Sequence, residues 1–112
     1  MASFSFASDP MDPTIFARWA FERVIDAART HVTDPNLLDR LTRAVALDGL
    51  HFEMVDTDQV MPLIDAVRAG VGDVSSQLER SSREPVDESF LWALKHLDLK
   101  LARERVTFSD AD

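Results

Sequence analysis

Residues 59–80 read QVMPLIDAVRAGVGDVSSQLER and contain the clearest periodicity in the chain. The large apolar residues of this stretch are spaced by four and three positions in turn, which places them on one face of a helix. They are Val60, Ile64, Val67, Val71, Val74 and Leu78. This spacing is typical of a helix that packs lengthwise against neighbouring helices. Gly70 and Gly72 weaken the helix by about 1 kcal/mol each relative to Ala, so we expect a kink or a close helix contact there.

Two Asp-Pro pairs, at 12–13 and at 34–35, predict the starts of two further helices. In each pair the carboxylate can cap the helix, and the proline fits the first turn because its missing N–H is not needed there. The apolar periodicity that follows predicts helices over residues 13–31 and 35–55.

A fourth helix is predicted over residues 87–105, with Asp87 as its cap and an apolar seam along one side. The seam consists of Phe90, Leu94, Leu97 and Leu101. Four amphipathic helices with short connections predict an all-α fold, either a bundle or a compact helical array. We expect a single helical domain over residues 13–108, a flexible segment 1–12 before it and a frayed end at 109–112.

Residues 50–55 can be interpreted in two ways, because apolar and polar side chains alternate there with the period of a strand. We predict continued helix, since a single strand needs a partner. Alternation also occurs in residues 3–6 and 105–108. A small α+β variant of the fold therefore results if 50–55 and 105–108 are strands.

Composition limits the function classes. The chain has 112 residues, 46% of them hydrophobic, with no Cys and a net charge of −8. This length predicts one domain. The lack of Cys excludes disulfides and thiol chemistry. We find no targeting segment and no stretch of apolar residues that could span a membrane, so we expect a cytoplasmic protein without a membrane partner.

The negative charge is concentrated in residues 44–79, which contain seven acids and one base and carry −6 of the −8. Such a segment can attract a basic surface of another protein. We predict electrostatic binding of a protein partner through Asp56, Asp58, Asp65 and Asp73. The same charge argues against a helix-turn-helix DNA binder and against nucleic acid as a partner, because phosphate contacts require Lys and Arg.

Both tryptophans lie off the main apolar stripe of their helices. Trp19 falls on the polar side of its helix, and Trp92, with Leu99 seven residues later, lies opposite the seam of the last helix. Such residues are either buried on a second side within the monomer or available for association. We predict that Trp19, Trp92 and Leu99 form a self-association surface and that the protein is a homodimer.

The leading hypothesis is a small interaction module, such as an adaptor, an inhibitor or an immunity-like protein, with no catalytic residues and no cofactor. The alternative is a metal-dependent or acid/base enzyme centred on His51. Asp48, Glu53 and Asp56 are close to His51 in sequence and, with it, are weak candidates for metal ligands. The chain contains no Glu-x-x-His motif of a dinuclear bundle and no glycine-rich phosphate loop, so the sequence favours a protein that is not an enzyme.

Overall fold

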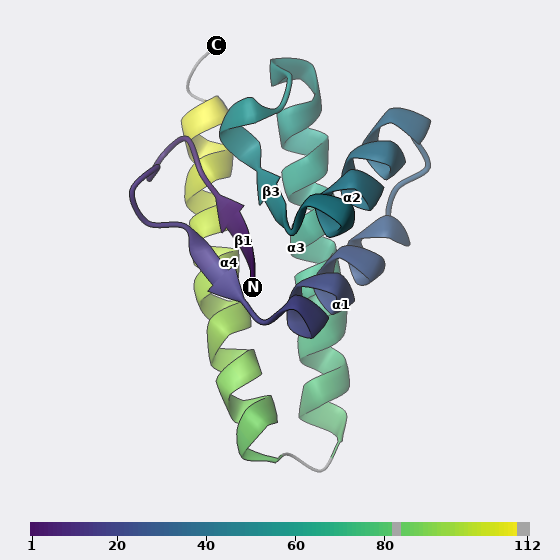
Figure 1. The fold of residues 1–112 in the computed structure, drawn as a ribbon, viewed down its shortest axis with the longest axis vertical. Helices are drawn as coiled ribbons and strands as arrows, with labels where there is room; N and C mark the ends of the chain where they lie inside the picture. Colours follow the sequence, from purple (N-terminus) through teal and green to yellow (C-terminus); the bar gives the residue numbers. More distant parts are fainter. Residues whose placement is uncertain (82–83, 110–112) are drawn as a thin grey trace.

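The computed structural model describes residues 1–81 and 84–109. In this part of the chain four α-helices and a small three-stranded sheet form one compact body (Figure 1). The elements in chain order are β1 (Ala2–Ser5), β2 (Thr14–Phe16), α1 (Arg18–Arg29), α2 (Pro35–Leu47), β3 (Gly49–His51), the 3-10 turn η1 (Phe52–Met54), α3 (Thr57–Arg80) and α4 (Pro85–Ser109). The predicted set of four helices is confirmed, in the variant that also has a small sheet. Residues 110–112 of the predicted frayed end lie outside the described residues.

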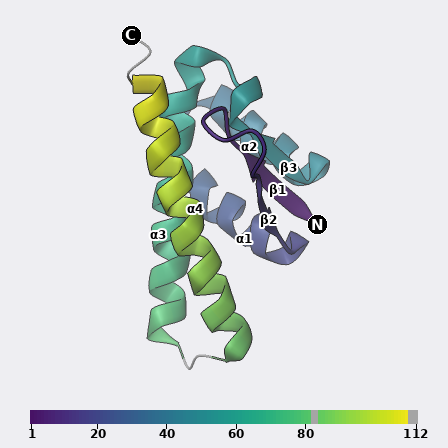
Figure 2. The same ribbon diagram turned by 90° about the vertical axis from the view of Figure 1, so that its left-hand side faces the viewer.

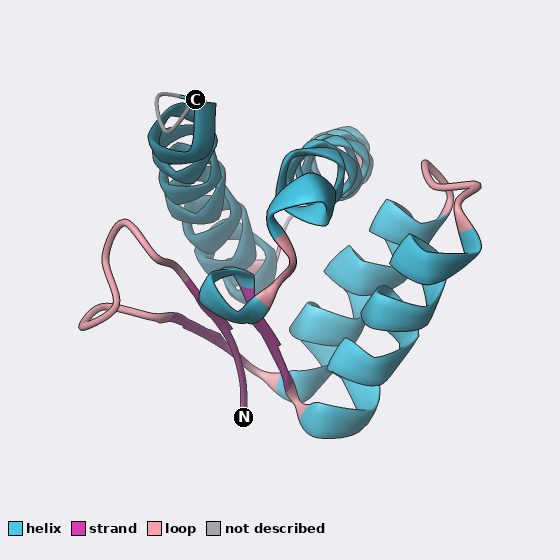
Figure 3. Ribbon diagram, turned by 90° about the horizontal axis from the view of Figure 1, so that it is seen from above, coloured by secondary structure: helices cyan, strands magenta, loops and turns pink. Residues whose placement is uncertain are grey.

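The two long helices α3 and α4 form an antiparallel hairpin, and the other elements pack around its upper half (Figure 1). Helix α1 packs against α3, and α2 packs against α1. Seen from above, α4 and the pair α1 and α2 lie on opposite sides of α3, and the sheet closes the space between α4 and α1 (Figure 3). The lower half of the hairpin projects beyond the rest of the molecule (Figure 2).

The Asp-Pro pairs at 12–13 and 34–35 have different outcomes. Helix α2 begins at Pro35 as predicted, and Asp34 caps it by accepting a hydrogen bond of 2.8 Å from the Asn36 N–H. The predicted start at residue 13 is wrong, because residues 14–16 form β2 and α1 begins only at Arg18. Strand β2 pairs antiparallel with β1, which buries Phe16 in the core. Tertiary pairing thus outweighs the local helix signal.

The predicted continuation of the second helix to residue 55 is also wrong. Helix α2 ends at Leu47, and Asp48 adopts a left-handed conformation with φ of 54° that turns the chain into β3. Strand β3 pairs parallel with β1, with Phe4 opposite Leu50, so the strand order is β2-β1-β3. The strand alternative is therefore correct for residues 50–51, whereas residues 105–108 belong to α4 and are helical.

The N-terminal segment 1–12, predicted above to be flexible, contains the central strand of the sheet. Phe4 and Phe6 are fully buried. Beyond the strand, the carboxylate of Glu104 on α4 accepts hydrogen bonds from the backbone N–H groups of Ala7 (2.7 Å) and Ser8 (2.8 Å). Apolar burial and these two bonds tie the segment to the helices, a link between residues too distant in sequence for a local pattern to reveal.

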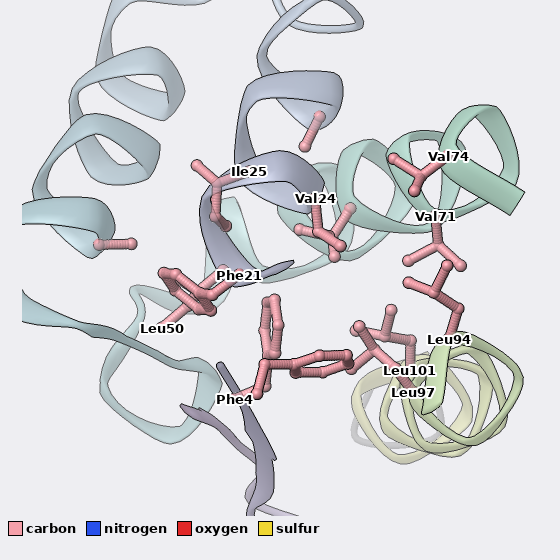
Figure 4. Close-up of a cluster of buried hydrophobic side chains, with 14 of the residues drawn as sticks. Phe4, Phe21, Val24, Ile25, Leu50, Val71, Val74, Leu94, Leu97 and Leu101 are labelled. Carbon is pink, nitrogen blue, oxygen red and sulfur yellow. The ribbon is translucent and has the colours of Figure 1, made fainter. Parts of the chain in front are cut away.

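The core lies where α1, α3 and α4 meet the sheet (Figure 4). All six residues of the predicted α3 stripe are buried there, which confirms that prediction. Gly70 lies at a close helix contact, because a Cβ on it would lie 2.6 Å from the Ala28 backbone nitrogen of α1. Gly72 has no such contact, since nothing lies within 4 Å of the position of its Cβ. The expectation of a close helix contact therefore holds for Gly70 alone.

Candidate interaction surface

Three large apolar side chains are exposed along one side of α4. Trp92 is 65% exposed, Leu99 64% and Val106 59%. They are seven residues apart, which is close to two helical turns, so they lie on one line along the helix. We call these three residues the α4 outer face. The opposite side of α4 carries the predicted seam, and all four seam residues are buried.

The α4 outer face is exposed because the other elements cover α4 from one direction only. In Figure 2, α3 lies behind α4, the sheet lies to the right of α4, and no described element lies over the side of α4 that faces the viewer. The indole of Trp92 contacts the imidazole of His96, with 4.0 Å between the ring centres. His96 is one helical turn away, so this contact restricts the orientation of an otherwise exposed ring.

A groove runs between α3 and α4 beside this face, and we call it the α3–α4 groove. Its volume is about 660 Å³. Small residues of α3, namely Ala69, Gly72 and Ser75, form one side, and Leu94 and Leu99 of α4 form the other. Leu99 belongs to both the groove and the α4 outer face. The two features therefore form one continuous, largely apolar surface.

An ion pair borders the α3–α4 groove. The guanidinium of Arg68 on α3 donates a hydrogen bond of 2.9 Å to the carboxylate of Asp98 on α4. Both residues also line the groove. A ligand in the groove would thus contact an apolar floor and a polar edge, an arrangement common in protein interfaces.

Trp19 lies elsewhere. It is 51% exposed, and its ring packs edge-on against Phe90, with 5.2 Å between the ring centres. It borders a smaller hollow of about 200 Å³, together with Ile15 and Val86. Of the three residues predicted to form a self-association surface, the structure brings Trp92 and Leu99 together and places Trp19 in a separate hollow.

Most of the four acids predicted to bind a basic partner contact basic side chains of this chain. Three of them bind a base of another element: Asp56 binds Arg40 (3.5 Å), Asp65 binds Arg105 (2.9 Å) and Asp73 binds His31 (2.6 Å). The hydrogen bond to Asp65 raises the pKa of the Arg105 guanidinium above its ordinary value. Asp58 is exposed, and we find no ion pair for it among the described residues. Asp56 and Asp65 are therefore paired with arginines of α2 and α4, and Asp73 is hydrogen-bonded to His31, which follows α1.

Of the four candidates for a metal site, the structure brings only His51 and Glu53 together, with 3.8 Å between His51 Nδ1 and a carboxylate oxygen of Glu53 among the described residues. Asp48 binds Arg18 at 3.3 Å, and Asp56 binds Arg40. Within residues 1–81 and 84–109 no group of three or more His, Asp or Glu side chains is placed to hold a metal ion.

His51 instead contacts Ser5, its neighbour across the sheet, through Nδ1 and the hydroxyl. The Ser5 hydroxyl also lies 3.0 Å from a carboxylate oxygen of Glu53, to which it can donate its proton. In a nucleophilic relay the imidazole lies between the hydroxyl and the acid. Here the Ser5 hydroxyl lies between the His51 imidazole and the Glu53 carboxylate. This order favours a structural role, in which the three side chains connect β1 to the segment that follows β3. No motif in the sequence marks Ser5, and the alternation in residues 3–6 is the signal that could have found it.

Comparison of the chain with protein-family models, with curated proteins and with solved structures finds no match. None of the helices in the described part of the chain is both long enough and apolar enough to cross a membrane. The function is therefore inferred from the geometry of the chain itself.

Proposed function

We propose that this protein is a small protein–protein interaction module that binds its partner through the α4 outer face and the α3–α4 groove. The observation that carries the proposal is the regular line of Trp92, Leu99 and Val106 beside an open apolar groove. Single exposed apolar residues are normal on a protein surface. A line of three with helical spacing next to a groove is instead typical of a helix-binding surface.

The chemistry of this surface suits protein binding. Trp is the residue type most often found at energetic hot spots of interfaces, because it buries a large rigid area at low entropic cost. Leu99 adds an aliphatic contact at the centre of the surface, and Arg68 and Asp98 provide polar groups at its edge. The module would serve as an adaptor, an inhibitor or an immunity-like protein in the cytoplasm.

Charge contributes to this proposal at long range. The net charge of −8 favours a partner with a basic surface. Asp58 is the predicted acid best placed to act on such a partner, since the other three bind bases of this chain. We therefore assign the contact energy to the α4 outer face and only the steering of the approach to the acids.

The alternative of an enzyme centred on His51 has less support. The candidate carboxylates Asp48 and Asp56 bind arginines, and Glu53 lies against the Ser5 hydroxyl. Among the described residues, the candidate groups left beside His51 are the Ser5 hydroxyl and the Glu53 carboxylate, and their order is not that of a nucleophilic relay.

Photo-crosslinking in the native cell tests the interaction module. A benzophenone amino acid at position 99 should form an adduct with another protein chain, whereas the same group at position 47 should not. Leu47 is a matched control, because it is 75% exposed and lies at the end of α2. If position 99 gives no protein adduct above the level of position 47, the proposed function is refuted.

A further inference from the structure

Two basic side chains lie among the apolar residues of the α4 outer face. Lys95 follows Trp92 by three residues, and Arg103 precedes Val106 by three. Each base is four residues from Leu99, so all five side chains lie on one side of the helix. Both bases are exposed, and we find no ion pair for either of them among the described residues. The proposed binding surface therefore carries two unpaired positive charges.

The acids closest to this surface do not neutralise these charges. Asp98 binds an arginine of α3 at 2.9 Å, and Glu104 is fully buried. Glu88 already interacts within the chain. Glu79, near the end of α3, is exposed, but it does not line the α3–α4 groove. Lys95 does line the groove, so the positive charge lies at the contact surface itself.

We propose that the segment of the partner that docks here is an amphipathic helix with an apolar stripe and acidic flanks. This inference deepens the proposed function and rests on it. The apolar stripe packs in the α3–α4 groove against Leu99, and carboxylates beside the stripe pair with Lys95 and Arg103. The groove accepts such a stripe because its volume of about 660 Å³ is lined largely by apolar and small side chains.

The spacing of the surface residues matches a helix that lies along α4. Trp92 and Val106 are 14 residues apart, a distance of about 21 Å or four turns. Lys95 and Arg103 are eight residues apart, or about 12 Å. Two acids about seven or eight residues apart on one side of the partner helix would therefore face both bases. Gly72 leaves room for the partner, since nothing lies within 4 Å of the position of its Cβ.

The net charge of the chain does not conflict with acidic flanks on the docking helix. The charge of −8 acts on the whole partner while it approaches. At physiological ionic strength charges are screened beyond about 8 Å, so the pairs formed in the complex depend on the side chains next to the groove. Those side chains include Lys95 and Arg103. The partner is thus basic as a whole and acidic beside the apolar stripe of one helix.

A second copy of the chain suits this surface less well. A two-fold interface brings the same patch of both copies together. Lys95 and Arg103 of each copy would then meet no free carboxylate among the described residues of that patch. Two chains of net charge −8 also repel each other. We therefore expect a partner of different sequence.

Charge variants of the crosslinking experiment test the inference on the native partner. With the benzophenone group at position 99, Lys95→Glu combined with Arg103→Glu should lower the adduct yield about fivefold, because acids then face acids. Arg29→Glu combined with Arg43→Glu is the matched control, since it changes the net charge equally at exposed residues of α1 and α2. The control should leave the yield unchanged. Lys95→Ala with Arg103→Ala should give a smaller loss, which keeps the test valid if the Glu variant does not fold.

Two synthetic peptides test the charge of the docking helix directly. Each is about 18 residues long, or five turns, and carries Leu at alternating spacings of three and four. The flanking positions are Glu in one peptide and Lys in the other. By fluorescence anisotropy, the Glu peptide should bind the purified full chain about fivefold more tightly than the Lys peptide, and the variant with Lys95→Glu and Arg103→Glu should reverse the order. A Lys peptide that binds the wild type as tightly as the Glu peptide overturns the inference, as does binding of neither peptide at about 500 μM.

The outcomes also separate the inference from the proposed function. An adduct with a different protein that depends on Lys95 and Arg103 supports both. An adduct whose yield is unchanged in the variant with Lys95→Glu and Arg103→Glu overturns the acid-flanked helix and leaves the interaction module in place, and a self-adduct does the same. No adduct at position 99 above the control at position 47 overturns both.

Discussion

The contrast between Gly70 and Gly72 gives a direct test of how α1 and α3 pack. A Cβ on Gly70 would lie 2.6 Å from the Ala28 nitrogen and 3.0 Å from both the Ala28 Cα and the Val24 carbonyl oxygen. All three are backbone atoms of α1, so no side-chain rotation can relieve the clash. A normal contact requires about 3.5 Å or more, and α1 must therefore move by nearly 1 Å.

The magnitude follows from comparing two alanine variants. Gly70→Ala and Gly72→Ala both gain helix propensity, about 1 kcal/mol each. Only Gly70→Ala adds the strain of overpacking, typically 1–3 kcal/mol, and we expect the upper part of that range because the clash is with backbone. Gly72→Ala should therefore stabilise the monomer by about 1 kcal/mol, and Gly70→Ala should destabilise it by about 1–2 kcal/mol.

Urea unfolding monitored by circular dichroism measures both variants, at a protein concentration where sedimentation shows monomer. The difference between the two free energies of unfolding isolates the helix contact, because the propensity gain cancels. If Gly70→Ala is as stable as Gly72→Ala, the close packing of α1 on α3 is refuted.

Three further predictions concern side chains that fix the backbone, and urea unfolding measures each. Glu104→Ala should lower the free energy of unfolding by about 2–4 kcal/mol, because the N–H groups of Ala7 and Ser8 lose their acceptor; a loss below 1 kcal/mol would contradict the stabilising role of these two hydrogen bonds. Asp34→Ala should cost about 1 kcal/mol through the lost α2 cap, whereas Asp34→Ser should keep most of it; equal losses would argue against capping. Asp48→Gly should be more stable than Asp48→Ala by about 1 kcal/mol, because Ala disfavours the left-handed conformation; the reverse order would exclude backbone strain there.

The helices could be predicted where the signal is local. The α3 stripe has one period over more than five turns, and Asp34 precedes its helix with the capping geometry that the dipeptide implies. The same dipeptide at Asp12 does not begin a helix, since the residues after it pair with β1 instead. The two sequences are alike over the window that a local rule uses, and the difference lies in a strand partner elsewhere in the chain.

The sheet could not be predicted for the same physical reason. Phe4 and Leu50 are register partners although 46 positions separate them, and neither strand is longer than four residues. Such short strands carry little pattern of their own. Their stability comes from non-local pairing and from burial against the helices.

For the candidate surface, too, the features set by one helix could be predicted from the sequence, and the contacts between elements could not. The exposure of Trp92 and Leu99 follows from helical geometry once the seam of α4 is known, so the sequence could place them on one side. The contacts of Asp65 and Asp73 could not be foreseen, because Arg105 reaches Asp65 from α4 and His31 reaches Asp73 from the turn after α1. Charge counts along a sequence describe a segment, whereas the surface depends on which elements meet.

The two hydrogen bonds from Ala7 and Ser8 to the Glu104 carboxylate have a consequence for how the chain folds during synthesis. Ala7 leaves the ribosome 97 residues before the carboxylate that holds it. At about 5–20 residues per second, this interval is roughly 5–20 s. During that time the segment after the central strand lacks its hydrogen bonds to Glu104, and the strand lacks the part of the core that α4 supplies. The side chains of Phe4 and Phe6 therefore remain accessible to other molecules. Completion of the sheet is therefore delayed until the last helix has been made, and until then chaperones have access to the first strand.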